Sequence, residues 1–280
     1  IELTDDLSYA RTFYPKSKTV RYLNQLAGQY FIDIYQYRKK DKGKLIRFWI
    51  EELPIIMYRH RKYMLYAFIF FFAGVALGAF SQSQNQEFAN YILGDPYVNM
   101  TLENIENGDP MGVYKDSDKA GMFFSITTNN IKVAFNAFVL GILCSVVTIG
   151  LLFYNGVILG VFQYFFFERG ILTVSSSALL LHGTLEISAI IIAGGAGILL
   201  GNSFLFPGSY RRMNSLMRAA KDALKIAVGL IPVFIVAGFI ESYFTRLTEM
   251  PVIFNLFIIG ASAIFIVWYF FYYPFLVNKK

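Results

Sequence analysis

The chain has little of what supports chemistry in a soluble enzyme. It holds one cysteine, Cys144, and two histidines, and only 16% of its residues are charged. A single cysteine excludes an intramolecular disulfide and a thiolate metal site, so we expect Cys144 to be a small core residue. The patterns HExxH, GxSxG, GxGxxG and the P-loop are absent. Enzyme activity is therefore a minority interpretation, and no catalytic residue, metal or cofactor is predicted.

Apolar residues are abundant instead. The 280 residues are 56% hydrophobic, with a mean hydropathy of +0.48, which is far more apolar than a soluble domain requires. Five runs are long enough to cross a bilayer as helices: residues 63–80, 133–154, 178–201, 223–243 and 252–273. Residues 157–167 form a sixth, shorter run. These runs predict an all-α, polytopic membrane bundle with the lipid bilayer as its main partner.

The charges are segregated along the chain. Residues 1–62 carry thirteen Lys/Arg and seven Asp/Glu, a balance of +6, whereas residues 81–130 carry two and seven, a balance of −5. The positive-inside bias therefore places the N-terminus, the basic segment 211–221 and the C-terminal Lys279-Lys280 in the cytoplasm. A membrane explains the net charge of +6 better than a nucleic acid does, so no nucleic-acid partner is predicted.

The short run 157–167 has to cross if the basic segment 211–221 is cytoplasmic. We therefore expect six crossings, with a turn at Asn155-Gly156 between the second and the third. The third crossing is then short, since about 11–13 helical residues span only about 17–20 Å.

Five regions are expected along the chain. Residues 1–62 form cytoplasmic amphipathic and interfacial helices that end in a basic cluster for the membrane surface, Arg59, Arg61 and Lys62. Residues 63–80 form the first transmembrane helix, and 81–130 an acidic extracytoplasmic loop. A solvated loop is the simpler interpretation there, and a small folded cap is the alternative. Residues 131–275 form the membrane core, with a cytoplasmic basic loop at 203–222, and 276–280 a cytoplasmic tail.

Small residues at four-residue spacing predict close approaches between helices. The pairs are Gly74/Gly78, Gly156/Gly160 and Gly197/Gly201. Whether they join helices of one chain or of two is open at this point. A spare Gly74/Gly78 face on an outer helix would favour a homodimer.

A buried polar cluster is predicted near the extracytoplasmic face. Glu186 lies within an apolar run, one helical turn after His182, and the two share a helix face. The predicted topology places Glu186 about 12 Å and His182 about 6 Å below the outer end of their helix. The same topology brings four further polar residues to that side: Glu241, Asn130, Asn136 and Glu168.

Several roles for this cluster stay open. In the simplest, His182 and Glu186 bond to each other or to an asparagine on a facing helix and fix the helix register. In the second, Glu186 is the acid of a proton-linked, ion-binding or partner-binding site. A zinc site is weaker still, because only the set His182, Glu186 and Glu241 could form it.

Five elements together resemble the stage II sporulation protein M family of bacterial and archaeal membrane proteins. They are Asn155-Gly156 with Gly160, His182-Gly183-x-x-Glu186, the small-residue stretch 194–201, Glu241-x-x-x-Thr245, and the proline and basic cluster within 53–62. The resemblance covers roughly residues 47–246.

The resemblance implies an inner-membrane assembly factor rather than a defined chemistry. The family's namesake recruits partner proteins that remodel peptidoglycan during engulfment, so other membrane or extracytoplasmic proteins are expected partners. We therefore interpret the chain as an inner-membrane scaffold. The alternative is a transporter or channel component that uses Glu186 and His182 as a proton-responsive site.

Overall fold

The structure is a computed structural model that describes residues 2–36, 43–107, 119–143, 145–245 and 252–279. Cys144, and with it the expectation of a small core residue, lies outside the described residues. The chain divides into two compact units, residues 1–48 and 49–280. In the first unit α1 (Glu2–Phe13) packs on α2 (Lys18–Gln36), and Arg11 donates a hydrogen bond to Asn24 at 2.7 Å. The short helix α3 (Lys44–Arg47) follows.

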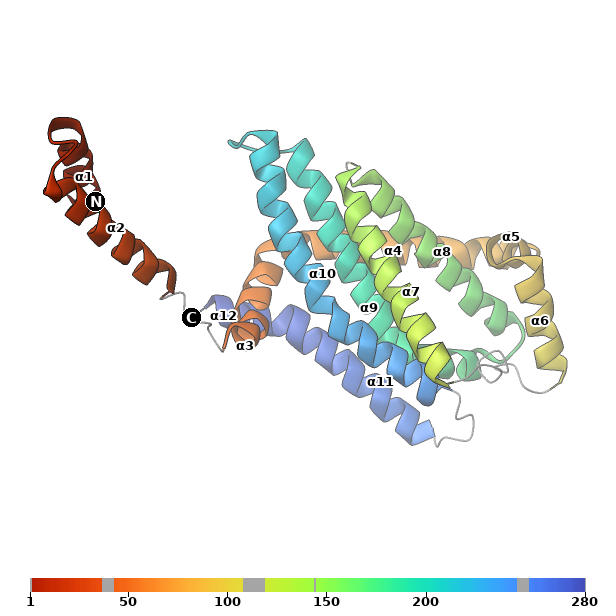
Figure 1. Cartoon of the computed structure of the whole chain (residues 1–280). Coiled ribbons are helices and arrows are strands. Elements are labelled where there is room, and N and C mark those ends of the chain that lie inside the picture. Colours follow the sequence, from red (N-terminus) through yellow and green to blue (C-terminus); the bar gives the residue numbers. More distant parts are fainter. Residues whose placement is uncertain (1, 37–42, 108–118, 144, 246–251, 280) are drawn as a thin grey trace. The chain divides into compact units, whose positions relative to one another are not determined.

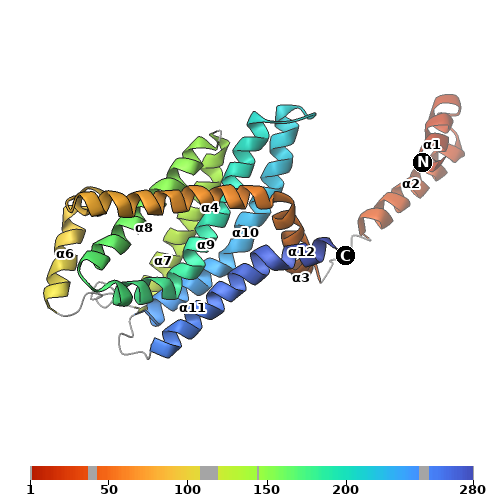
Figure 2. The same ribbon diagram turned by 180° about the vertical axis from the view of Figure 1, so that it is seen from behind.

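The second unit is a helical membrane bundle (Figures 1 and 2). The described part of the chain contains five helices that are long and apolar enough to cross a membrane, and it contains no strand. The helices of this unit are α4 (Leu53–Gln84), α5 (Phe88–Leu93), α6 (Asp95–Glu106), α7 (Lys119–Val139), α8 (Val146–Glu168), α9 (Leu172–Leu205), α10 (Arg212–Tyr243), α11 (Val252–Ile266) and α12 (Tyr273–Asn278). Shorter pieces are η1 (Phe48–Glu52), η3 (Leu140–Ile142) and η4 (Val267–Tyr272). The chain is an all-α polytopic membrane protein, as predicted.

Helix α9 is the central element of the bundle. It contacts α4, α7, α8, α10 and α11, and 78% of its most apolar stretch is buried, against 17% in the α11–α12 segment. In Figure 1, α7, α9 and α10 run side by side, with α4 crossing behind them. Side chains on α9 are therefore the best placed to join several helices.

The predicted turn at Asn155-Gly156 is wrong, because both residues lie inside α8. The chain turns earlier, at η3 and Ser145, whose φ of 64° is left-handed. Two buried hydroxyls hold this turn: Ser145 donates to the carbonyl of Ile198 at 2.9 Å, and Thr148 donates to that of Ala137 at 2.7 Å. The run 133–154 is therefore split between α7 and α8, and the helix that follows the turn has 23 residues and is not short.

Successive long helices run in opposite directions, so every second one is parallel. Helices α4 and α8 run parallel, since Gly74 meets Phe153 and Gln82 reaches Glu168 further along both. Helices α7 and α9 also run parallel, since Gly197 meets Ala137 and Glu186 meets Asn130. Helix α7 is not among the five apolar candidates, so six crossings stay a prediction.

The glycine pairs of α4 and α8 face each other within one chain. A Cβ at Gly74 or Gly78 would overlap the carbonyl oxygen of Phe153 or Val157. A Cβ at Gly156 or Gly160 would likewise overlap the backbone of α4. The two backbones therefore touch, and the Gly74/Gly78 face is not spare. The reason for expecting a homodimer on that face is removed.

The glycines at the end of α9 serve the turn before α8. A Cβ at Gly197 would overlap the carbonyl oxygen of Ala137, and one at Gly201 would overlap the backbone of Ser145 and Gly141. Helix α9 can approach this turn because it presents no side chain there.

The segment expected to be a solvated loop contains two helices, α5 and α6. Ala89 and Val98 are buried against Val161, Phe165 and Phe166 of α8. The described residues 85–107 therefore form a small cap on the bundle. The expected basic loop 203–222 is also mostly helical, since only residues 206–211 lie between α9 and α10.

Candidate functional site

Three helices bring polar side chains together near the end of the bundle where α9 begins and α10 ends. His182 and Glu186 come from α9, one turn apart on the same face. Glu241 lies in the last turn of α10, and Thr245 follows that helix by two residues. Asn130 comes from α7. We call these five residues the His-Glu cluster.

The cluster is held by contacts between helices. The His182 Nδ1 atom lies 3.2 Å from the Thr245 hydroxyl oxygen, and the opposite ring nitrogen, Nε2, lies 3.8 Å from the Glu241 Oε1 atom. The Asn130 side chain lies close to the Glu186 carboxyl. The two carboxyl groups of Glu186 and Glu241 are close enough to interact electrostatically. The cluster therefore connects α7, α9 and α10.

The cluster is enclosed by protein. His182 and Asn130 are 4% and 6% exposed, and the Glu241 side chain is 12% exposed. In the part of the chain that the structure describes, neither Glu186 nor Glu241 forms an ion pair with Lys or Arg. Two carboxylates in such a place repel each other unless a proton or a cation lies between them.

A metal ion could be held by three of these residues. One ligand atom each from His182, Glu186 and Glu241 can be chosen so that all three lie within 4.8 Å of one another. One imidazole and two carboxylates can also share or pass a proton. The geometry therefore allows a proton-linked or a metal-binding site.

Two residues predicted for the cluster lie elsewhere. Asn136 is exposed on α7, because it is six residues from Asn130 and so points about 120° away around the helix. Glu168 ends α8, where its Oε2 atom accepts a hydrogen bond from Gln82 at 3.3 Å and lies 3.9 Å from Arg169. Sequence reasoning did not place Thr245 in the cluster. Its spacing of four residues from Glu241 was the signal that could have done so.

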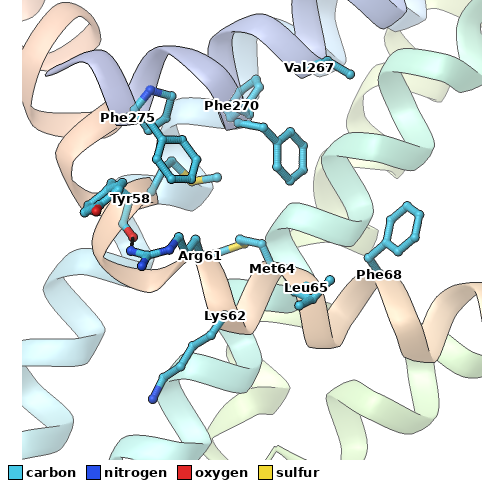
Figure 3. Close-up of a pocket in the computed structure, with 12 residues that line it drawn as sticks. Tyr58, Arg61, Lys62, Met64, Leu65, Phe68, Val267, Phe270 and Phe275 are labelled. Atoms are coloured by element: carbon cyan, nitrogen blue, oxygen red, sulfur yellow. Dashed lines mark hydrogen bonds between the residues drawn. The ribbon is translucent and has the colours of Figure 1, made fainter. Parts of the chain in front are cut away.

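The predicted basic cluster is divided among different contacts. Arg59 and His60 both reach the Asp222 carboxylate of α10, at 3.3 and 2.9 Å. Arg61 instead donates to the Tyr58 carbonyl at 3.0 Å and lies over the Tyr58 ring at 4.3 Å (Figure 3). Arg61 and Lys62 line an apolar groove of about 610 Å³ between α4 and the α11–α12 segment. Binding of this cluster to a membrane surface stays a prediction.

Comparison with known families agrees with the resemblance seen in the sequence. The model of stage II sporulation protein M matches residues 67–246, a range that contains the whole His-Glu cluster. A domain of unknown function, DUF8413, matches residues 1–36, the segment of α1 and α2. No curated protein and no solved structure matches the chain. The chain belongs to the stage II sporulation protein M family.

Proposed function

We propose that this protein is an inner-membrane scaffold that assembles partner proteins, with both termini in the cytoplasm and the α5–α6 cap outside. The observation that carries this proposal is the composition of α9. Every residue from 189 to 201 is buried, and each is Ala, Ile, Leu or Gly. This stretch gives the central helix about 18 Å without a polar side chain.

A transporter needs polar groups that continue from one face to the other, and α9 offers none over that length. At the other end of α9, Asn202 donates to the Tyr63 hydroxyl at 2.8 Å, so its amide is used within the protein. Backbones touch between α4 and α8 and between α9 and the η3 turn, so these helices have little room to move relative to one another. These features favour a fixed framework over alternating access.

The cap is the surface that best suits an extracytoplasmic partner. Its exposed charges are all acidic: Glu87, Asp95, Glu103 and Glu106. The described cap residues 85–107 include no Lys or Arg. Such a surface favours a basic protein partner through charge complementarity.

Two measurements test the proposal. The first is proton flux into proteoliposomes that enclose a pH-sensitive dye. The scaffold predicts the leak of protein-free liposomes for both the wild-type protein and Glu186→Gln. A leak that the wild type carries and Glu186→Gln abolishes would instead establish the transport alternative.

The second measurement is photo-crosslinking in cells of the source organism. A photoreactive residue at the exposed cap position Asn99 should give a discrete protein adduct, which Glu103→Gln with Glu106→Gln weakens. The same residue at Phe257, which is 69% exposed on α11, is the matched control and should give none. No adduct at Asn99 would contradict a partner on the cap.

A further inference from the structure

We propose that His182, Glu186 and Glu241 form a binding site for one divalent transition-metal ion, with zinc as the best match. This inference goes beyond the scaffold role and does not depend on it. It also revises the sequence expectation that the chain holds no metal.

The candidate ligand atoms lie close together. Two protein atoms that bind one tetrahedral zinc at about 2.0–2.2 Å lie roughly 3.3–3.6 Å apart. The His182 Nε2 and Glu241 Oε1 atoms are 3.8 Å apart, and the three candidate ligand atoms all lie within 4.8 Å of one another. The three atoms are therefore within about 1.5 Å of the separations that one ion requires.

Side chains from outside α9 lie behind the candidate ligands. Metal-binding imidazoles commonly bond through their other nitrogen, which fixes the ring orientation. Here Thr245 lies on the Nδ1 side of His182 at 3.2 Å, and the opposite nitrogen, Nε2, faces Glu241. The Glu186 carboxyl has the Asn130 side chain of α7 beside it. Both supports come from outside α9, so the ring and the carboxyl are aimed by the tertiary fold.

The charge of the three side chains suits a divalent cation. Two ionised carboxylates and a neutral imidazole carry a charge of −2, which a divalent cation cancels. Among the described residues no Lys or Arg supplies that balance by an ion pair. Buried charges in proteins are paired or coordinate metals, and a neutral site suits the apolar surroundings of α9.

The donor set selects the class of metal. One imidazole nitrogen with two carboxylate oxygens suits zinc or a neighbouring transition metal, whereas magnesium and calcium prefer oxygen ligands alone. Three protein ligands leave a fourth tetrahedral position for water or for a group from a partner. The three protein ligands alone let the ion join α9, through His182 and Glu186, to α10, through Glu241.

The experiment is metal analysis of the full-length protein, purified through a peptide tag that binds no metal. We expect about one zinc per chain, and after removal by a chelator, one zinc restored per chain with a rise in the thermal unfolding temperature. Cobalt added to the metal-free protein should give the visible absorption bands of a low-symmetry Co²⁺ site.

Variants locate the site. Glu241→Gln and Glu186→Gln should lose stoichiometric zinc, and Thr245→Val should weaken zinc binding roughly tenfold, as loss of a supporting hydrogen bond does. The control variants are His60→Gln and Glu168→Gln, whose side chains bind Asp222 and Gln82 instead. Both should keep one zinc.

Two results would overturn the proposal. One is wild-type protein that takes up no zinc, shows no cobalt bands and has an unchanged unfolding temperature. The other is zinc retained in folded Glu186→Gln and Glu241→Gln, which would place the ion elsewhere. If these variants fail to fold, the wild-type titration alone decides between the outcomes.

Discussion

The His182 imidazole of α9 and the Thr245 hydroxyl beyond α10 lie 3.2 Å apart although 63 residues separate them in the sequence. Both side chains are buried, and the contact fixes which nitrogen of the ring faces Glu241. The relation ties the chemistry of the cluster to the packing of two long helices.

Thr245→Val should lower the free energy of unfolding by about 1–3 kcal/mol, because it removes a buried hydroxyl that contacts the His182 imidazole while keeping the side-chain shape. Thr184→Val is the control, since among the described residues the half-buried Thr184 hydroxyl bonds only to the Leu180 carbonyl of its own helix. Thermal unfolding in detergent measures both. Equal losses would mean that the Thr245 contact contributes nothing specific.

Gly160→Ala should destabilise the bundle by about 1–3 kcal/mol, because the new methyl group overlaps the Val75 carbonyl of α4 and forces the helices apart. Gly150→Ala is a matched control in the same helix, where a Cβ meets nothing within 4 Å. Chemical unfolding of the two variants compares them. A Gly160→Ala protein as stable as Gly150→Ala would contradict the close contact of α4 and α8.

Tyr63→Phe should cost about 1–2 kcal/mol, because the Asn202 amide then loses the acceptor to which it donates at 2.8 Å. Tyr66→Phe, on the same helix and 46% exposed, should change stability little. The unfolding temperature reports the difference. A Tyr66→Phe loss as large as that of Tyr63→Phe would show that phenol removal in α4 acts nonspecifically.

Phe166→Ala should release the cap, because Phe166 is 1% exposed in the cluster that joins α5 and α6 to α8. We expect a loss of about 3–5 kcal/mol in local stability. Hydrogen exchange at residues 88–106 should speed up, whereas Phe167→Ala, at a neighbouring exposed position, should leave it unchanged. Unchanged exchange in Phe166→Ala would mean that the cap does not depend on this packing.

Apolar content and helical periodicity were enough to predict the membrane bundle, because each crossing helix must satisfy its backbone internally and cover it with apolar side chains. The i, i+4 spacing placed His182 and Glu186 on one face for the same local reason. The turn at Asn155-Gly156 was predicted wrongly, since both residues lie inside α8, where Gly156 serves a close contact with α4. Local sequence does not distinguish a glycine that turns from one that packs.

The sequence by itself therefore determined the fold class, the family motif and the shared face of His182 and Glu186 on α9, which depend on residue type and spacing along the chain. Only the tertiary structure decided that Glu241, Asn130 and Thr245 meet that face while Asn136 and Glu168 do not. It also decided that Gly74 and Gly78 pack within the chain. The physical reason is that rotation and register between helices are set by packing across many residues, which no short motif contains.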